Sequence, residues 1–132
     1  MAKYALLLGL LLVVALSVCS CGQKAQAPPS GEVADAASRF VEMMAGGDFA
    51  AAAEGFDAKM KAALTPEGLR DVWASLTGKF GAFQEQAGVR TAQEQGYEAA
   101  YVTCRFERGS AVVKVVYNLT GQISGLWIQP AE

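Results

Sequence analysis

The sequence predicts an α+β domain in which three N-terminal helices pack on a curved antiparallel β-sheet. Two observations along the chain support this class. Residues 32–80 carry apolar side chains at helical spacing, whereas residues 82–129 carry them in alternation. Short turns separate the alternating segments, which makes neighbouring strands antiparallel. A chain of 132 residues has room for one such domain.

Two helices are expected first. Residues 32–45 form the first helix, and the glycine pair that follows ends it. Asp48 is placed to cap the second helix, which Gly55 and Asp57 can break into two pieces. The apolar faces of these helices comprise Val33, Ala36, Ala37, Phe40, Val41 and Met44, then Phe49, Ala52, Ala53, Phe56, Met60 and Leu64.

A third helix joins the helical half of the domain to the strand half. Thr65 and Pro66 suit its start, because threonine caps free backbone N–H groups and proline has none to leave unpaired. Its apolar face comprises Leu69, Val72, Trp73, Leu76 and Phe80. Gly78 and Gly81 are expected to end it. We interpret Trp73 and Phe80 as core residues that close one end of the domain, and the wall of a ligand pocket is the alternative for Trp73.

Four strands are expected at residues 82–91, 97–107, 111–119 and 122–129. One face of the sheet is apolar and is predicted to cover the helices; it comprises Ala100, Val102, Cys104, Phe106, Val113, Val115, Tyr117, Leu119, Leu126 and Ile128. The opposite face is partly apolar through Tyr101, Val112, Val116, Ile123 and Trp127. A sheet with two partly apolar faces favours strong curl, a pocket or a dimer interface.

The first twenty residues are predicted to be a signal peptide. Lys3 precedes an apolar run that is shorter than the roughly 20 residues of a membrane-spanning helix. The run ends in Val18-Cys19-Ser20-Cys21, which resembles the acylation site of bacterial lipoproteins and makes Cys21 the lipidated residue. Acylation at Cys19 and an ordinary signal-peptidase cut after Ala27 are the alternatives.

The predicted lipoprotein has a lipid anchor at Cys21, a tether over residues 21–31 and a domain over residues 32–132. Several acyl chains would anchor it stably to a bacterial membrane, facing the periplasm or the exterior. Loss of Lys3 leaves 10 basic and 13 acidic side chains. This balance argues against nucleic acid as a partner. Cys104 has no remaining cysteine partner, so stability must come from the core.

The order of motifs resembles a family of uncharacterised bacterial secreted domains. The matching pieces are Phe40, Gly47-Asp48-Phe49, Phe56-Asp57, Met60, Leu64, Trp73, Phe80-Gly81, Cys104-Arg105-Phe106 and residues 121–130. The resemblance implies a cone-shaped fold of the nuclear-transport-factor-2-like, or cystatin-like, kind. Some members precede an α/β-hydrolase domain, and the present sequence ends before one. The resemblance implies no reaction, since the wider superfamily contains isomerases, dehydratases and binding modules.

The residue types present restrict the candidate chemistry. The sequence has no histidine, which removes the commonest general base and a common metal ligand. No cofactor and no metal site are expected. Cys104 alternates with apolar residues and is interpreted as a buried small hydrophobe. Glu98 is the carboxylate to test as a base, with a solvated glutamate as the ordinary interpretation. Arg105 and Lys114 on the second sheet face are candidates for an anion site, with surface charges as the alternative.

The leading functional hypothesis is a lipid-anchored envelope domain that binds a small apolar ligand or an envelope protein and catalyses no reaction. Its candidate pocket or core residues are Trp73, Phe80, Tyr101, Arg105, Lys114 and Trp127. One alternative is a small isomerase- or lyase-like enzyme with a carboxylate inside the cone. A second alternative is a structural homodimer that buries the second sheet face.

Overall fold

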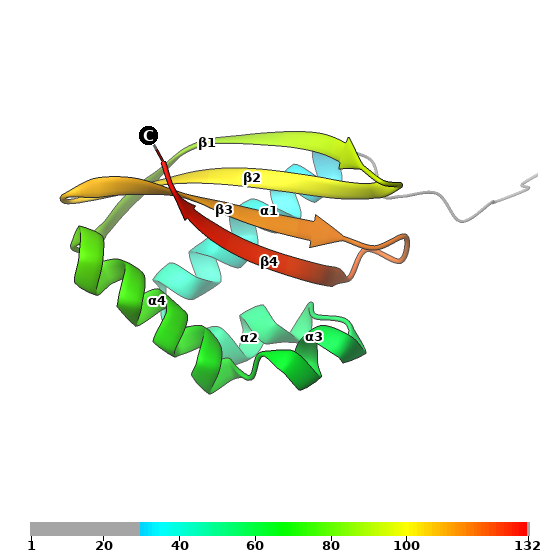
Figure 1. Ribbon diagram of the computed structural model, residues 1–132, viewed down its shortest axis with the longest axis horizontal. Helices are drawn as coiled ribbons and strands as arrows, with labels where there is room; N and C mark the ends of the chain where they lie inside the picture. The colour runs from blue at the N-terminus through cyan, green and yellow to red at the C-terminus, as the bar shows by residue number, and fades with distance from the viewer. Residues whose placement is uncertain (1–29, 132) are drawn as a thin grey trace, which may run out of the picture.

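The computed structural model describes residues 30–131, which form four helices and one four-stranded sheet. The helices are α1 (Ser30–Ala45), α2 (Phe49–Glu54), α3 (Ala58–Ala63) and α4 (Pro66–Phe80). The strands are β1 (Phe83–Glu94), β2 (Tyr97–Phe106), β3 (Gly109–Tyr117) and β4 (Ile123–Pro130). All four helices lie on one side of the sheet (Figure 1). The predicted α+β class and the order of helices before strands are therefore confirmed.

The predicted count of three helices is wrong, because the second one is divided. The backbone of Phe56 forms a parallel bridge with Ile123 of β4. Asp57 then starts a new helix, since its Oδ1 accepts a hydrogen bond of 2.8 Å from the Met60 N–H. The helix is thus divided at Gly55 and Asp57, the two residues at which the sequence allowed a break.

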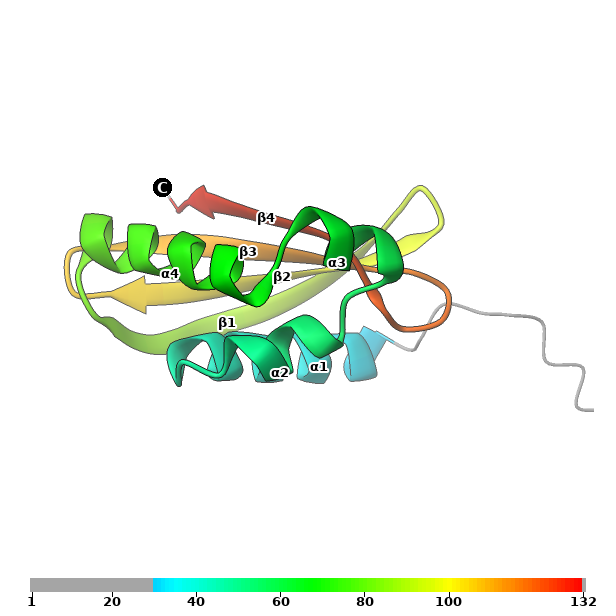
Figure 2. The same ribbon diagram turned by 90° about the horizontal axis from the view of Figure 1, so that it is seen from below.

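The long helix α4 begins and ends close to the predicted residues. Thr65 Oγ1 accepts a hydrogen bond of 3.1 Å from the Gly68 N–H, and Pro66 occupies the first turn. The helix runs through Gly78 and stops at Gly81, whose φ of 87° is in the region that favours glycine. Gly81 alone therefore ends the helix, and the chain turns there into β1 (Figure 2).

The sheet is an antiparallel meander in the order β1-β2-β3-β4. The two-residue turn Gln95–Gly96, with both φ angles positive, joins β1 to β2, as expected for a tight hairpin. β1 extends to Glu94, three residues past its predicted end. A bulge between Val116 and Tyr117 shifts the register of β3 and β4. The predicted placement of Ile123 on the same face as Trp127 is therefore wrong: Ile123 is buried in the core, whereas Trp127 is exposed.

The space between the helices and the sheet is filled by one apolar core. The inward faces of β2 and β3 alternate as predicted, and Leu119 lies beyond the end of β3 and is exposed. The largest fully buried side chains belong to Phe40, Phe56, Met44, Leu69, Val33, Val41, Val102, Val113, Val115 and Cys104. The helices thus cover the inner face of the sheet and leave the opposite, outer face without a covering element (Figure 1).

Candidate functional site on the outer face of the sheet

A row of four side chains crosses the outer face from one edge of the sheet to the other. Arg90 of β1 is opposite Tyr101 of β2, Tyr101 is opposite Lys114 of β3, and Lys114 is opposite Trp127 of β4. The Arg90 guanidinium carbon lies 3.8 Å from the centre of the Tyr101 ring. Lys114 Nζ lies 5.4 Å from the ring centres of both Tyr101 and Trp127. Cations and aromatic rings therefore alternate along the row at distances that favour cation–π attraction.

Glu94 at the end of β1 joins this row through two hydrogen bonds. Its Oε2 lies 2.7 Å from Lys114 Nζ, and its Oε1 accepts a hydrogen bond from the Tyr101 hydroxyl. The hydrogen bond from Lys114, followed by that from Tyr101, lowers the pKa of Glu94 below its ordinary value. The same contact with Glu94 raises the pKa of Lys114. Both groups therefore stay charged at neutral pH.

Trp127 lies on the outer face with its ring folded over its own strand. A Cβ atom at Gly125 would lie 2.4 Å from Cζ3 and 2.5 Å from Cη2 of Trp127. Glycine at this position thus allows the indole to rest directly on the backbone of β4. The indole covers Gly125 and is itself 52% exposed.

An open groove of about 750 Å³ runs over this part of the outer face. Its lining residues come from β3 and β4, from the end of β1 with the turn into β2, and from the start of α3 at the edge of the sheet. The lining residues are Asp57, Lys59, Glu94, Gln95, Tyr97, Lys114, Val116, Ser124 and Trp127. The groove therefore combines exposed aromatic rings with charged and hydroxyl groups, and we take it as the candidate site.

Two of the six predicted candidates belong to the core. Trp73 is only 7% exposed, and its ring centre lies 5.6 Å from that of Phe83 and 5.7 Å from that of Phe106. Phe80 also packs on Phe106, at 5.9 Å between ring centres. The interpretation of Trp73 as a core residue is therefore supported by its burial.

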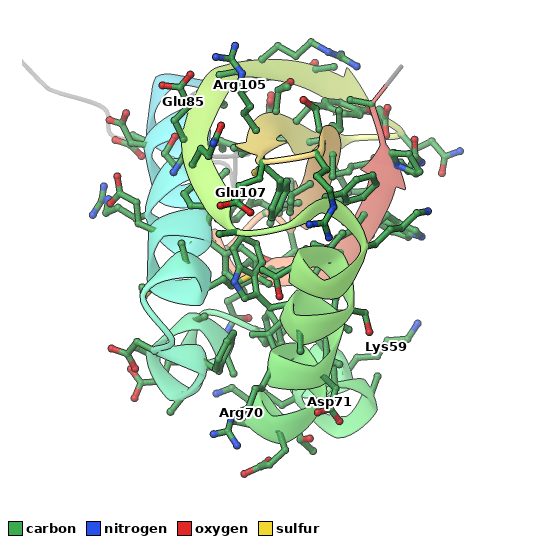
Figure 3. The ribbon with its side chains drawn as sticks, turned by 90° about the vertical axis from the view of Figure 1, so that its left-hand side faces the viewer. Lys59, Arg70, Asp71, Glu85, Arg105 and Glu107 are labelled. Atoms are coloured by element: carbon green, nitrogen blue, oxygen red, sulfur yellow. The ribbon has the colours of Figure 1, made fainter. Side chains whose placement is uncertain are left out.

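Arg105 lies on the outer face, but four residues along β2 from Tyr101 and away from the groove. Its Nη1 forms an ion pair of 2.6 Å with Glu85 Oε1 (Figure 3). Lys114 has its own carboxylate partner in Glu94. The structure places the two cations of the predicted anion site on the same face, yet each is neutralised by a separate glutamate.

The inner side of the sheet holds three groups with possible chemistry. Glu98 is 5% exposed and accepts a hydrogen bond of 2.8 Å from Gln93 Nε2. Burial raises the pKa of the Cys104 thiol to about 12, so it is a neutral thiol at physiological pH. Tyr117, whose pKa burial also raises, lines a pocket of about 250 Å³ between α1, α2 and the β3–β4 turn.

Among residues 30–131, no group of three or more histidine, cysteine or acidic residues is gathered closely enough to hold a metal ion. Within the same residues, no helix has the length and apolar character needed to cross a membrane. Cys21 and the predicted signal peptide lie outside the described residues, as does the tether before Ser30.

Residues 37–126 match the family described as "Protein of unknown function (DUF3887)". The chain belongs to this family. The match runs from the middle of α1 to the middle of β4. It includes the groove residues up to Ser124 and ends one residue before Trp127. The predicted resemblance to an uncharacterised domain family is therefore confirmed at the level of the DUF3887 family.

One curated protein is similar to this chain over most of the chain's length. Esterase EstD of Thermotoga maritima is 28% identical over 92 residues, which cover 70% of this chain and 22% of the esterase. The chain thus spans about a fifth of the length of that relative. No solved structure matches the chain significantly.

Sequence reasoning placed Tyr101, Lys114 and Trp127 on the same face of the sheet, because alternation along a strand reveals which side chains share a face. It did not predict that Glu94 and Tyr97 line the groove together with Lys114 and Trp127. Their membership depends on the register between strands, and no single strand encodes that register.

Proposed function

We propose that this chain is a lipid-anchored binding module of the bacterial cell envelope that catalyses no reaction. The observation that carries the proposal is the groove on the outer face, with the half-exposed indole of Trp127 in its lining. Open grooves with aromatic anchors and a few placed polar groups are typical of binding sites. The ligand classes expected from the sequence are a small apolar molecule or a segment of another envelope protein.

The finer fold assignment is part of this proposal. We infer that the domain is a member of the nuclear-transport-factor-2-like superfamily with its helices and curved sheet forming a cone. The helix-then-meander order supports this assignment. The filled inner face of the sheet favours a ligand site on the outer face over one inside the cone.

The similarity to an esterase bears on the proposal in one way. A related segment occupies about a fifth of that longer protein, so we propose that the module can accompany a hydrolase in other chains. The present sequence lacks the histidine that serine esterases use as general base. Binding, rather than ester hydrolysis, is therefore the activity that we propose for this chain.

The isomerase- or lyase-like alternative requires a carboxylate that acts as a base near neutral pH. Bases of this kind have a raised pKa, whereas the pKa of Glu94 is lowered by Lys114 and Tyr101. Glu98 is buried and hydrogen-bonded to Gln93. The homodimer alternative would bury Trp127 and the charged row between two copies of the chain.

Native mass spectrometry of the chain purified from its own host tests the proposal and the homodimer alternative. We expect a monomer that carries a bound ligand or partner, and loss of that species in Trp127→Ala. Leu119→Ala is the matched control, since Leu119 is similarly exposed but lies outside the groove. An empty monomer would contradict the binding proposal, and an unliganded dimer would favour the homodimer.

A further inference from the structure

Large apolar side chains are exposed at only three positions within residues 30–131, and two of them line the groove. Trp127 is 52% exposed and Tyr97 is 44% exposed, and both belong to the groove lining. The third, Leu119, lies outside it. Exposed aromatic rings gathered at one hollow mark an interaction site, because a folded domain otherwise buries them.

The Trp127 indole lies against its own strand and beside a cation. Its inner side rests on Gly125, and the Lys114 ammonium group lies 5.4 Å from its ring centre. Lys114 is held in turn by Glu94. A ring that is already immobilised loses little conformational entropy on binding. The exposed side of the indole is thus a preformed flat platform.

The charges around this platform balance. The groove is lined by two acidic side chains, Asp57 and Glu94, and by two basic ones, Lys59 and Lys114. Glu94 and Lys114 neutralise each other, and Asp57 Oδ1 also caps α3. Such a lining offers no net attraction to an anion or a cation. It suits a neutral ligand.

The polar groups of the lining indicate a ligand with hydroxyl groups rather than a hydrocarbon. Ser124, Gln95 and the charged side chains provide both donors and acceptors. A purely apolar ligand would cover these groups without replacing their hydrogen bonds to water, which is costly. The ligand must therefore have one apolar surface for the indole and polar groups around its rim.

Sugar rings have this combination of properties. The C–H groups of a pyranose form an apolar face that stacks on the electron-rich face of an aromatic ring. Its hydroxyl groups point outward around the ring, where donors and acceptors are needed. The groove is open and about 750 Å³ in volume, which admits several linked units.

We propose that the outer-face groove binds a neutral oligosaccharide, with one sugar ring stacked on Trp127 and the hydroxyl groups contacting the polar lining. This inference rests on the proposed function as a binding module and names its ligand class. The occupied stretch would lie between the β1–β2 turn and the start of α3.

Isothermal titration calorimetry of the full chain, kept in a detergent without a sugar headgroup, tests the inference. The probes are the β-1,4-linked tetramers of glucose, N-acetylglucosamine and mannose. We expect at least one of them to bind with a dissociation constant below about 1 mM. The affinity should change little between about 50 and 500 mM NaCl, because a neutral ligand gives salt no charge to screen.

Variants of the platform locate the binding site. Trp127→Ala should weaken binding at least about tenfold, as loss of a central aromatic anchor does. Gly125→Ala keeps the indole but pushes it off the strand, and we expect a similar loss. Leu119→Ala should bind like the wild type. Circular dichroism of each variant checks that the fold is retained.

Absence of binding to all three tetramers would overturn the inference, as would full affinity in Trp127→Ala. These results are distinct from failure of the proposed function. A ligand seen by native mass spectrometry without any sugar binding would overturn the saccharide assignment alone. An empty monomer without sugar binding would overturn both.

Discussion

Trp73 and Trp127 occupy opposite environments, and each is explained by its neighbours. Trp73 lies among Phe83 and Phe106 and is 7% exposed, whereas Trp127 lies on a glycine and is 52% exposed. Trp73 therefore contributes to folding through buried area and aromatic contacts. Trp127 is exposed to solvent and is the proposed contact for a ligand.

Truncation of Trp73 should be far more destabilising than truncation of Trp127. We expect Trp73→Ala to lower the free energy of unfolding by about 3–5 kcal/mol, because it removes a large buried aromatic side chain. Trp127→Ala should cost less than about 1 kcal/mol, as exposed substitutions usually do. Urea denaturation of both variants measures the difference. Equal losses would show that Trp73 does not anchor the core.

The Glu94–Lys114 pair should give the domain a pH-dependent contribution to stability. The lowered pKa of Glu94 means that its stabilisation is complete above its unfolded pKa of about 4.3 and is lost as pH falls through its folded value. The raised pKa of Lys114 means that its stabilisation is complete below about 10.4 and is lost at higher pH. The pair is therefore effective between these limits.

Thermal unfolding of Glu94→Gln at several pH values tests whether the stabilisation by Glu94 is lost as pH falls. The variant should melt below the wild type at pH 7, and the two melting temperatures should converge as pH falls below about 4. Glu85→Gln is a comparison on the same face, since its partner Arg105 is more exposed to solvent. A constant difference down to pH 2 would contradict the assigned role of the carboxylate charge.

At the scale of elements, helix ends and strand faces were predictable because local rules set them. Thr65, Pro66 and Gly81 mark the ends of α4, and alternation assigns the inner face of β2 and β3 correctly. The errors occur where contacts with a segment distant in the sequence determine the local structure. Phe56 leaves the helical pattern because it bridges to Ile123, and a bulge after Val116 turns Ile123 inward. Both depend on tertiary contacts that no local window contains.

For the candidate site, the sequence likewise predicted which side chains share a face but not all of the contacts between strands. Tyr101, Lys114 and Trp127 were assigned to one face from alternation alone. Their neighbour Glu94 was expected in a turn, because β1 was predicted to end at Thr91, yet it lies in the strand and pairs with Lys114. The polar composition of β1 gives only a weak strand pattern. The end of β1 is a strand because it pairs with β2.

Two glycines, one inside α4 and one at its end, should respond in opposite directions to the same substitution. Gly81 has a φ of 87°, and a Cβ there would lie 2.8 Å from the Glu107 Cβ. Gly81→Ala should therefore cost about 1–3 kcal/mol through backbone strain. Gly78 lies inside the helix, and a Cβ there would meet nothing within 4 Å, so Gly78→Ala should stabilise by about 0.5–1 kcal/mol. Chemical denaturation of the two variants measures both signs, and a neutral Gly81→Ala would contradict the role of Gly81 as the helix stop.

At the scale of the whole molecule, the two faces of the sheet have different roles. The inner face holds the core that keeps the domain folded without a disulfide among the described residues, where Cys104 is free and buried. The outer face carries the groove and the charged row. This division allows the outer face to change its side chains at small cost to stability, as the proposed binding role requires.

The proposed location predicts a separate outcome. If Cys21 carries the lipid anchor, Cys21→Ala should move the protein from the membrane fraction to the soluble fraction, because no acyl chains would hold it. Cys19→Ala is the matched control for the alternative acylation site. Fractionation followed by immunoblotting measures how each variant is distributed between the membrane and soluble fractions. Membrane attachment that persists in Cys21→Ala would contradict the assignment.

The central claim is that ligands are bound on the outer face of the sheet, at Trp127. Acrylamide quenching of fluorescence in Trp73→Phe, where Trp127 is the remaining tryptophan, tests it directly. We predict strong quenching in the purified protein and clear protection of Trp127 after addition of host envelope extract. Unchanged quenching of Trp127 in a sample that native mass spectrometry shows to be ligand-bound would contradict the claim.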